Sequence, residues 1–219
     1  MGLLDDLKKQ AEVVKSQQLD ENSLQADKLK TVEQKMKQTF DYLGDLFKQL
    51  AVLKPENTRA FPIPGMGDLG GMRFVESFID YRKKRIDDIE YFDSITFYVK
   101  WQRPDNPVIE SDMLGTIQKA RDALNQQKLK YTEESFKNAR GAAAIRLTAE
   151  LAMISNVNIN ADHVQGRLLV AASNVMRMGL EHLAIPAPEV NEALLETFAL
   201  MLLGQQTDMG KYRVVAPAR

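Results

Sequence analysis

The sequence predicts an α+β fold in which an N-terminal two-helix, coiled-coil-like arm precedes a mainly antiparallel sheet packed with helices. Apolar residues recur every seven residues in the first quarter of the chain, which is typical of a helix with one apolar stripe. Beyond residue 72 apolar and polar residues alternate, as in strands with one buried face. The expected units are a helical arm (1–54), a Pro/Gly linker (55–72), an α+β domain (73–204) and a loose C-terminal tail (205–219).

The composition is that of an ordinary globular protein, with 44% hydrophobic and 27% charged residues among 219. A net charge of −1 gives no general attraction to nucleic acid or anionic lipid, so neither is expected as a partner. The absence of cysteine excludes disulfides and thiol catalysis. Asp5 and Asp6 stand where a signal peptide needs basic residues, and the most apolar stretch, 193–203, is too short to span a bilayer. The expected location is the cytoplasm.

The arm begins with a short helix over about residues 3–18, because Leu4, Leu7, Ala11 and Val14 follow 3-4-3 spacing. The polar stretch 18–22 is expected to end this helix and to cap the next one.

A second helix is expected to run to about Leu53, and its heptad positions form the candidate interaction surface. Such a stripe needs a partner helix, which is either the first helix folded back or a second copy of the chain. The candidate residues are Leu29, Val32, Met36, Leu43, Leu46, Leu50 and Leu53.

The linker is predicted from Pro55, Pro62 and Pro64 and from four glycines between residues 65 and 71. Residues 65–70 spell G-x-G-x-x-G, but a dinucleotide site needs this motif between a strand and a helix. Here a Pro-x-Pro segment precedes the motif and a strand follows it, so the favoured interpretation is a flexible linker without a cofactor. A fragment starting near Met72 is then expected to fold alone.

A hairpin of two strands is expected over residues 73–83 and 89–102. Val75, Ile79 and Tyr81 would share one face of the first strand. The core face of the second would be filled by Ile89, Tyr91, Ile95, Phe97, Val99 and Trp101.

The remaining elements are a helix after Ser111, a short strand over 128–134, strands over 167–174 and 180–185, and a last helix from Pro188 to Gly204. Residues 143–162 favour helix by alanine content, but their period-two pattern predicts a long, bent strand. In that strand Leu147, Leu151 and Val157 face the core.

The chain resembles a group of bacterial proteins of unknown function. The resemblance is carried by the opening residues 2–11, by Asp80-Tyr81-Arg82, and by a closing helix that runs from Glu192 and ends in Leu202-Leu203-Gly204. It implies a bacterial cytoplasmic setting and transfers no active residues.

Candidate chemical sites are few. The basic cluster Arg82, Lys83, Lys84 and Arg85 is flanked by aspartates, which favours a solvated hairpin over a phosphate site and leaves contact with a partner open. The two histidines, His163 and His182, lack a third ligand at metal-site spacing, and no glycine-flanked serine suggests a hydrolase relay. We therefore assign no catalytic, cofactor or metal residue.

Three hypotheses for function remain. The first is a non-enzymatic interaction protein, a scaffold, adaptor or assembly factor, whose arm binds a second copy or another protein. The second is a regulatory module that binds a small ligand or a peptide on the sheet. The third is an enzyme of unrecognised type, which a deep polar pocket would favour.

Overall fold

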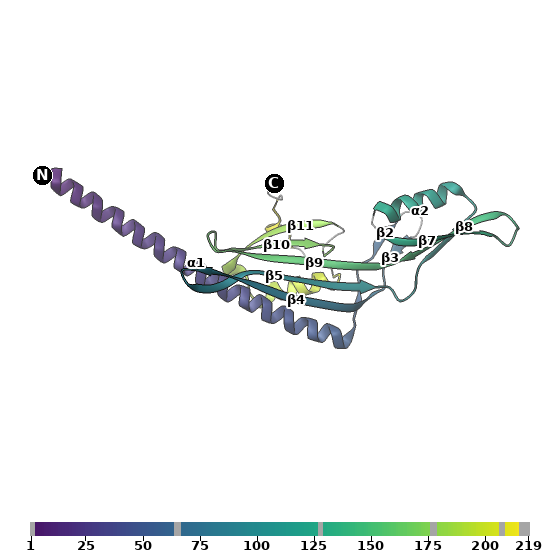
Figure 1. The fold of residues 1–219 in the computed structure, drawn as a ribbon, viewed down its shortest axis with the longest axis horizontal. Helices are drawn as coiled ribbons and strands as arrows, with labels where there is room; N and C mark the ends of the chain where they lie inside the picture. The colour runs from purple at the N-terminus through teal and green to yellow at the C-terminus, as the bar shows by residue number, and fades with distance from the viewer. Residues whose placement is uncertain (1–2, 64–66, 127–128, 176–178, 206–208, 215–219) are drawn as a thin grey trace.

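The computed structural model describes residues 3–63, 67–126, 129–175, 179–205 and 209–214, without the side chains of 3–11, 13, 14, 20, 61–63 and 67–69. A long helix α1 (Leu3–Leu53) extends from one end of a curled sheet, and a smaller sheet with helix α2 (Leu114–Gln126) forms the other end (Figure 1). The predicted α+β class with a mainly antiparallel sheet is confirmed.

Helix α1 is continuous, so the expected break at residues 18–22 and the two-helix arm are wrong. The 51 residues extend about 76 Å at about 1.5 Å per residue. No proline lies between Leu3 and Leu53, and three residues of the stretch 18–22, Gln18, Leu19 and Glu21, have high helix propensity. The capping residues in the stretch 18–22 therefore do not end α1, because no residue there prevents the helix from continuing.

Among the described residues, six strands form the main sheet in the order β1-β4-β5-β9-β10-β11, every pair antiparallel. Its members are β1 (Glu56–Asn57), β4 (Met72–Ile86), β5 (Ile89–Gln102), β9 (Ala152–Asp162), β10 (Arg167–Ser173) and β11 (Leu180–Pro186). The β4–β5 hairpin matches the prediction, and β5 has the predicted bounds.

The C-terminal half of α1 and helix α3 (Glu192–Leu202) cover one face of this sheet (Figure 1). The Phe47 ring lies 5.2 Å from that of Phe97 on β5, and the Phe198 ring of α3 lies 6.2 Å from the same ring. The core thus contains side chains of α1, the sheet and α3 together.

The expected alternation in the hairpin holds from Ile95 to Trp101 and fails near the hairpin turn. The register shifts between Arg82 and Lys83, so Phe92 is buried while Ile89 is 56% exposed. A second shift beside Phe74 leaves Val75 exposed, whereas Tyr81, although 42% exposed, keeps the predicted face and contacts the Phe40 ring of α1. Each bulge exchanges the faces of the residues beyond it, which a strict alternation cannot anticipate.

The smaller sheet has the order β6-β8-β7, with β6 (Val108–Ser111), β7 (Lys130–Lys137) and β8 (Ala143–Glu150), and α2 packs on it. Strand β6 was not predicted. Only Leu151 separates β8 from β9, so the expected long, bent strand over 143–162 is confirmed as two strands that join the sheets. Leu147, Leu151 and Val157 are buried as predicted.

Replacing Leu147 with Ala should therefore destabilise the protein by about 2–4 kcal/mol, because it leaves a cavity between β8 and α2. The matched variant Thr148→Ala changes the half-buried neighbour on the other face and should cost well under half as much. Urea unfolding of both variants measures the difference. Equal costs would contradict the assignment of Leu147 to the core.

The linker and the tail both pack on the body where the structure describes them. Strand β1 pairs with β4, and the buried Asn57 side chain donates to the carbonyl of Leu202 at the end of α3. Gly204 ends α3 with φ +84°, and a Cβ there would collide with Asn57. A short hairpin, β2 (Phe61–Ile63) with β3 (Gly67–Leu69), follows, and residues 64–66 of the glycine motif lie outside the described residues.

The last helix begins at Glu192 rather than at Pro188. Pro188 belongs to the 3-10 turn η1 (Ala187–Glu189), and the Asn191 side chain caps α3 by accepting the N–H of Leu194. Of the tail expected to be loose, Met209 and Tyr212 are buried around a second 3-10 turn, η2 (Gly210–Tyr212).

Candidate functional site

The N-terminal half of α1 extends away from the sheet (Figure 1). Every described side chain from Glu12 to Leu24 is exposed, including Leu19 at 69% and Leu24 at 60%. Residues 3–24 are called the free half below. An isolated helix of this length is only marginally stable in water, so a partner would stabilise it.

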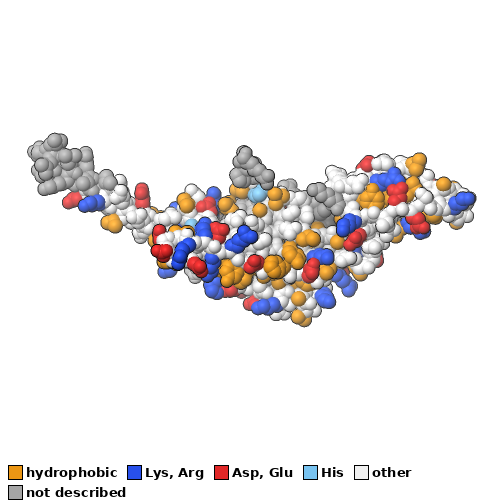
Figure 2. All heavy atoms as spheres, in the orientation of Figure 1, with side chains coloured by type: hydrophobic (Ala, Val, Ile, Leu, Met, Phe, Trp, Pro, Cys, Tyr) orange, Lys and Arg blue, Asp and Glu red, His pale blue; other side chains and the backbone are white. Residues whose placement is uncertain are grey.

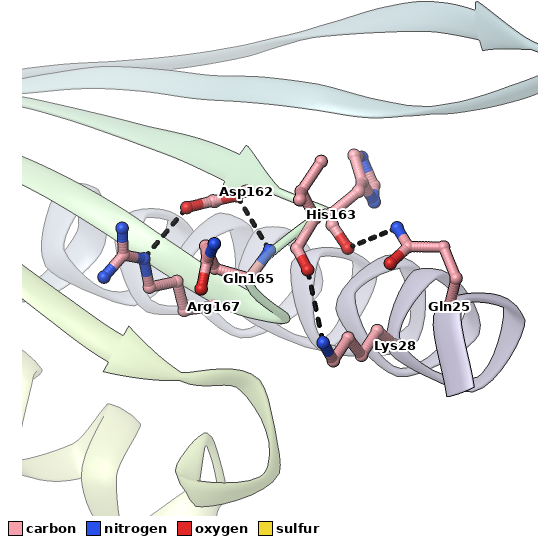
Figure 3. A network of polar contacts seen from close by, with 7 residues as sticks. Gln25, Lys28, Asp162, His163, Gln165 and Arg167 are labelled. Carbon is pink, nitrogen blue, oxygen red and sulfur yellow. Dashed lines mark hydrogen bonds and ion pairs between the residues drawn. The ribbon is translucent and has the colours of Figure 1, made fainter. Parts of the chain in front are cut away.

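The base of the free half is fixed by the turn between β9 and β10 (Figure 3). Gln25 donates from Nε2 to the carbonyl of His163 at 3.2 Å, and Lys28 donates from Nζ to the carbonyl of Val164 at 3.4 Å. Gly166 has φ +67°, and a Cβ there would lie 3.1 Å from the Lys28 side chain. The turn therefore needs glycine both for its conformation and for the close approach of α1.

Asp162 orders this turn through contacts of its carboxylate with Gln165 and Arg167 (Figure 3). One carboxylate oxygen accepts the N–H of Gln165 at 3.0 Å, and the other lies 2.9 Å from Nε of Arg167. Partial burial acts to raise the pKa of Asp162, but the bonds from Gln165 and Arg167 and the charge of Arg167 outweigh it, so the pKa is lowered. The charged form of Asp162 therefore stabilises the folded turn.

We expect Asp162→Asn to cost about 1–2 kcal/mol at neutral pH, because it weakens charge-assisted hydrogen bonds. Since the pKa is lowered on folding, this contribution is fully present above the ordinary carboxyl pKa of about 4 and is lost as the pH falls through the lowered value. Thermal unfolding of both proteins from pH 7 to pH 2 measures it. The Asp105→Asn variant, whose carboxylate also pairs with an arginine but is 66% exposed, is the control and should cost less. A gap between the Asp162 variant and the original protein that does not narrow as the pH falls below about 4 would contradict this account.

His163 joins the turn to strand β5. Its Nε2 lies 2.9 Å from the carbonyl oxygen of Phe92, which only accepts, so Nε2 carries the hydrogen. Glu33 of α1 accepts the N–H of the same Phe92 at 2.6 Å. Nδ1 of His163 is buried without a hydrogen-bond partner among the described residues. These contacts give His163 a structural role between β5, the turn and α1.

A groove of about 600 Å³ runs along α1 where the free half meets the body. One wall is α1 from Asn22 to Glu33, and the other is the tip of the β4–β5 hairpin. Its walls combine polar residues with the half-buried Leu29 and Ile86 and the exposed Ile89. No sequence pattern indicated this groove, because the bulges of β4 and β5 determine which hairpin side chains face α1.

The predicted heptad surface is used mainly inside the chain. Val32, Met36, Leu43 and Leu50 are buried against the sheet. Leu29 and Leu46 are half-buried, whereas Leu53 at the C-terminal end of α1 is 72% exposed.

The basic cluster lies on β4 with mixed surroundings. Arg82, Lys83 and Arg85 are exposed and Lys84 is half-buried, with ion pairs from Lys84 to Asp93 and from Arg85 to Asp88. Figure 2 shows positive and negative side chains interspersed on the visible face of the body. This distribution favours a solvated hairpin over an anion site.

The sheet face opposite to α1 carries His182, which the structure separates from His163. His182 lines a hollow of about 410 Å³ with Asn160, Arg167 and Val214. The rings of Phe78 and Tyr98 stack on this face at 6.0 Å. Within the described residues, no three His, Asp or Glu side chains are placed to hold a metal ion.

No helix in the described part of the chain is long and apolar enough to cross a membrane. Comparisons with protein-family models, with curated proteins and with solved structures found no match to this chain.

Proposed function

We propose that this protein is a non-enzymatic interaction protein in which the sheet domain carries α1 as a fixed association element. Under this proposal the free half of α1 binds a second copy of the chain, and this binding brings the two sheet domains together. The observation that carries the proposal is the division of α1 into a half buried in the core and a half whose described side chains are exposed.

Physical reasoning supports this division of roles. Five apolar side chains of the C-terminal half, Val32, Met36, Leu43, Phe47 and Leu50, are at most 5% exposed, so the direction of α1 is determined by the core. The free half continues the same helix and has the 3-4-3 apolar spacing from Leu4 to Val14, whose side chains lie outside the described residues. A preoriented helix with an apolar stripe loses little conformational freedom when it meets a partner.

The proposal is tested by removing residues 1–21 and measuring molar mass by light scattering. The full chain should have a mass at least twice that of one chain, and the shortened chain the mass of one chain. Because the contacts that hold α1 to the body begin at Gln25, the shortened chain should keep its circular dichroism spectrum and most of its thermal stability.

A control for the other end of α1 is Leu53→Asp, which places a charge at an exposed apolar residue of the same helix without touching the free half. In solution this variant should have the same molar mass as the unaltered full chain, at least twice that of one chain. The light-scattering measurement is repeated with the full chain at concentrations up to 100 times higher. If the full chain still has the mass of a single chain, self-association is contradicted.

A further inference from the structure

We propose that residues 209–214, called the strap below, cover the outer edge of β11 and keep it from pairing with the same edge of a second copy. Figure 1 shows β11 at one margin of the main sheet and β4 toward the other. β10 pairs with β11 along all seven of its residues, so the outer edge of β11 carries the next row of backbone N–H and C=O groups. This surface is separate from α1, so its test does not depend on the association proposed for the free half.

The strap lies on this edge as a short antiparallel segment. Arg213 forms a bridge with Leu183 in the middle of β11, and the N–H of Val214 donates to the carbonyl of His182 at 3.0 Å. Nε of Arg213 also lies 3.4 Å from the carboxylate of Glu181, whose side chain is only 3% exposed. The strap therefore occupies positions at which another strand would be added to the sheet.

Side chains on the rest of the strap fix it to the body. Met209 and Tyr212 are buried around the 3-10 turn η2. The Glu189 carboxylate of η1 accepts a hydrogen bond from the Tyr212 hydroxyl at 2.7 Å and another from Nζ of Lys211 at 2.9 Å. The buried Tyr212 ring thus combines an apolar contact with a polar one, and it is the side chain whose loss should free the strap.

The two margins of the main sheet are protected in different ways. Within the described residues β1 pairs with β4 only at Met72 and Arg73, and beyond them β4 has two bulges and the basic cluster at residues 82–85. Bulges and charged side chains on an edge both oppose pairing with another chain.

Between residues 180 and 185 β11 has neither device. Its pairing with β10 has no register shift. The side chains that it presents on the open sheet face include no Asp, Glu, Lys or Arg; they are Leu180, His182 and Ala184. We therefore assign the protection of this edge to the strap.

With the strap displaced, the same edge of a second copy is the occupant that fits. Two copies of one strand related by a two-fold axis pair antiparallel, as all neighbouring strands of the main sheet do. Such pairing opposes no like charges on the open face of β11 and joins the two six-stranded sheets into one. A flat row of unpaired backbone groups is a template for this contact.

Tyr212→Ala should release the strap, because it removes the buried ring and the bond to Glu189. Trypsin reports the release by cleavage after Lys211 and Arg213, which should be at least about tenfold faster than in the unaltered full chain because opening disrupts fewer buried contacts. The molar mass from light scattering should rise above that of the unaltered chain and increase with concentration. Tyr98→Ala, the same change on the open sheet face, is the matched control and should alter neither quantity.

A disulfide between the strap and β11 should reverse both effects. The bridge between Leu183 and Arg213 places His182 and Val214 opposite each other, and both line the same hollow. Opposed residues of antiparallel strands have Cα atoms about 5.5 Å apart, which suits a disulfide. Because the chain has no cysteine, His182→Cys with Val214→Cys gives one defined bond. Added to Tyr212→Ala and oxidised within single chains, it should return cleavage and mass to those of the unaltered chain, and reduction should undo this.

Near-ultraviolet circular dichroism and a sharp thermal transition establish that each variant is folded. If Tyr212→Ala does not fold, Val214→Pro replaces it with the same expected results, since it removes the N–H that bonds to His182 without changing a buried side chain. Arg213 has φ −63° and ψ 134°, a conformation that a following proline accepts.

Three outcomes overturn the proposal. One is unchanged cleavage in a folded release variant, and the second is fast cleavage without any rise in molar mass. The third is association that persists with the strap locked by the disulfide, because it would require a surface other than the β11 edge. Removing residues 1–21 should leave the effect of Tyr212→Ala on trypsin cleavage unchanged, so failure of the α1 association and failure of the strap are distinguished.

Discussion

Replacing Leu43 with Asp should abolish the cooperative folding of this protein, whereas Leu53→Asp in the same helix should shift the midpoint of thermal unfolding by only a few degrees. Both leucines occupy the heptad stripe of α1. Leu43 is fully buried against the sheet, and Leu53 is 72% exposed. Comparing the two variants therefore tests whether the apolar stripe of α1 packs in the core or contacts only a partner.

The expected size of the Leu43 effect follows from two contributions. Loss of the buried leucine costs about 2–5 kcal/mol, and a carboxylate placed in an apolar core adds several kcal/mol more. The sum is comparable with the total stability of an ordinary domain, about 5–15 kcal/mol. The variant should therefore show weak near-ultraviolet circular dichroism and no sharp thermal transition.

Thermal scans followed by circular dichroism at two wavelengths measure this prediction for both variants. A Leu43→Asp variant that keeps a sharp transition while it loses an oligomer would mean that the stripe is an association surface, as the sequence alone suggests. The control removes the objection that any charge on α1 is disruptive, because Leu53→Asp introduces the same charge about three turns further along the helix.

The heptad repeat shows how much of the packing of α1 can be predicted from the sequence. Its period correctly predicts a helix with one buried stripe, since Val32, Met36, Leu43 and Leu50 are all buried. It does not identify what buries them, because a helix seam packs equally well on a helix or on the concave face of a sheet. Only the fold determines that Phe47 meets Phe97 of β5.

The strands were predictable to a similar extent. The bent strand over 143–162 follows from its period-two pattern, and the break between its two strands, at Leu151, is where the chain passes between sheets. The faces near the β4–β5 turn were not predictable, because the bulges in this hairpin exchange the faces of Phe92 and Tyr91.

The groove of the candidate site combines residues from α1 and from the hairpin tip, which are far apart in the sequence. Neither segment has a pattern that refers to the other. The contacts of Gln25 and Lys28 with the β9–β10 turn are equally invisible in the sequence, because both side chains donate to backbone carbonyls rather than to matching side chains.

The second large effect concerns the independence of the sheet domain. The Pro/Gly content of residues 55–72 suggests a boundary, beyond which a fragment starting at Met72 would fold alone. The packing of α1 leads us to expect the opposite result. That fragment loses Phe40, which lies 4.9 Å from Tyr81, and Phe47, which lies 5.2 Å from Phe97.

Five apolar α1 side chains that are at most 5% exposed, Val32, Met36, Leu43, Phe47 and Leu50, would be missing from the fragment. At about 2 kcal/mol for each buried apolar side chain, their loss amounts to about 10 kcal/mol, which is of the order of the stability of a whole domain. Fragment 72–219 should therefore bind a hydrophobic dye and unfold without a sharp transition.

A peptide of residues 15–54 added in trans provides the matched test of this cause. It contains the five buried side chains and Gln25 and Lys28, so it should restore near-ultraviolet circular dichroism and a cooperative transition to the fragment. The same peptide with Leu43→Asp should not. If the fragment alone unfolds sharply and the peptide has no effect, α1 is an appendage of a domain that begins at Met72. If only the unaltered peptide restores folding, the first long helix and the sheet are one cooperative unit.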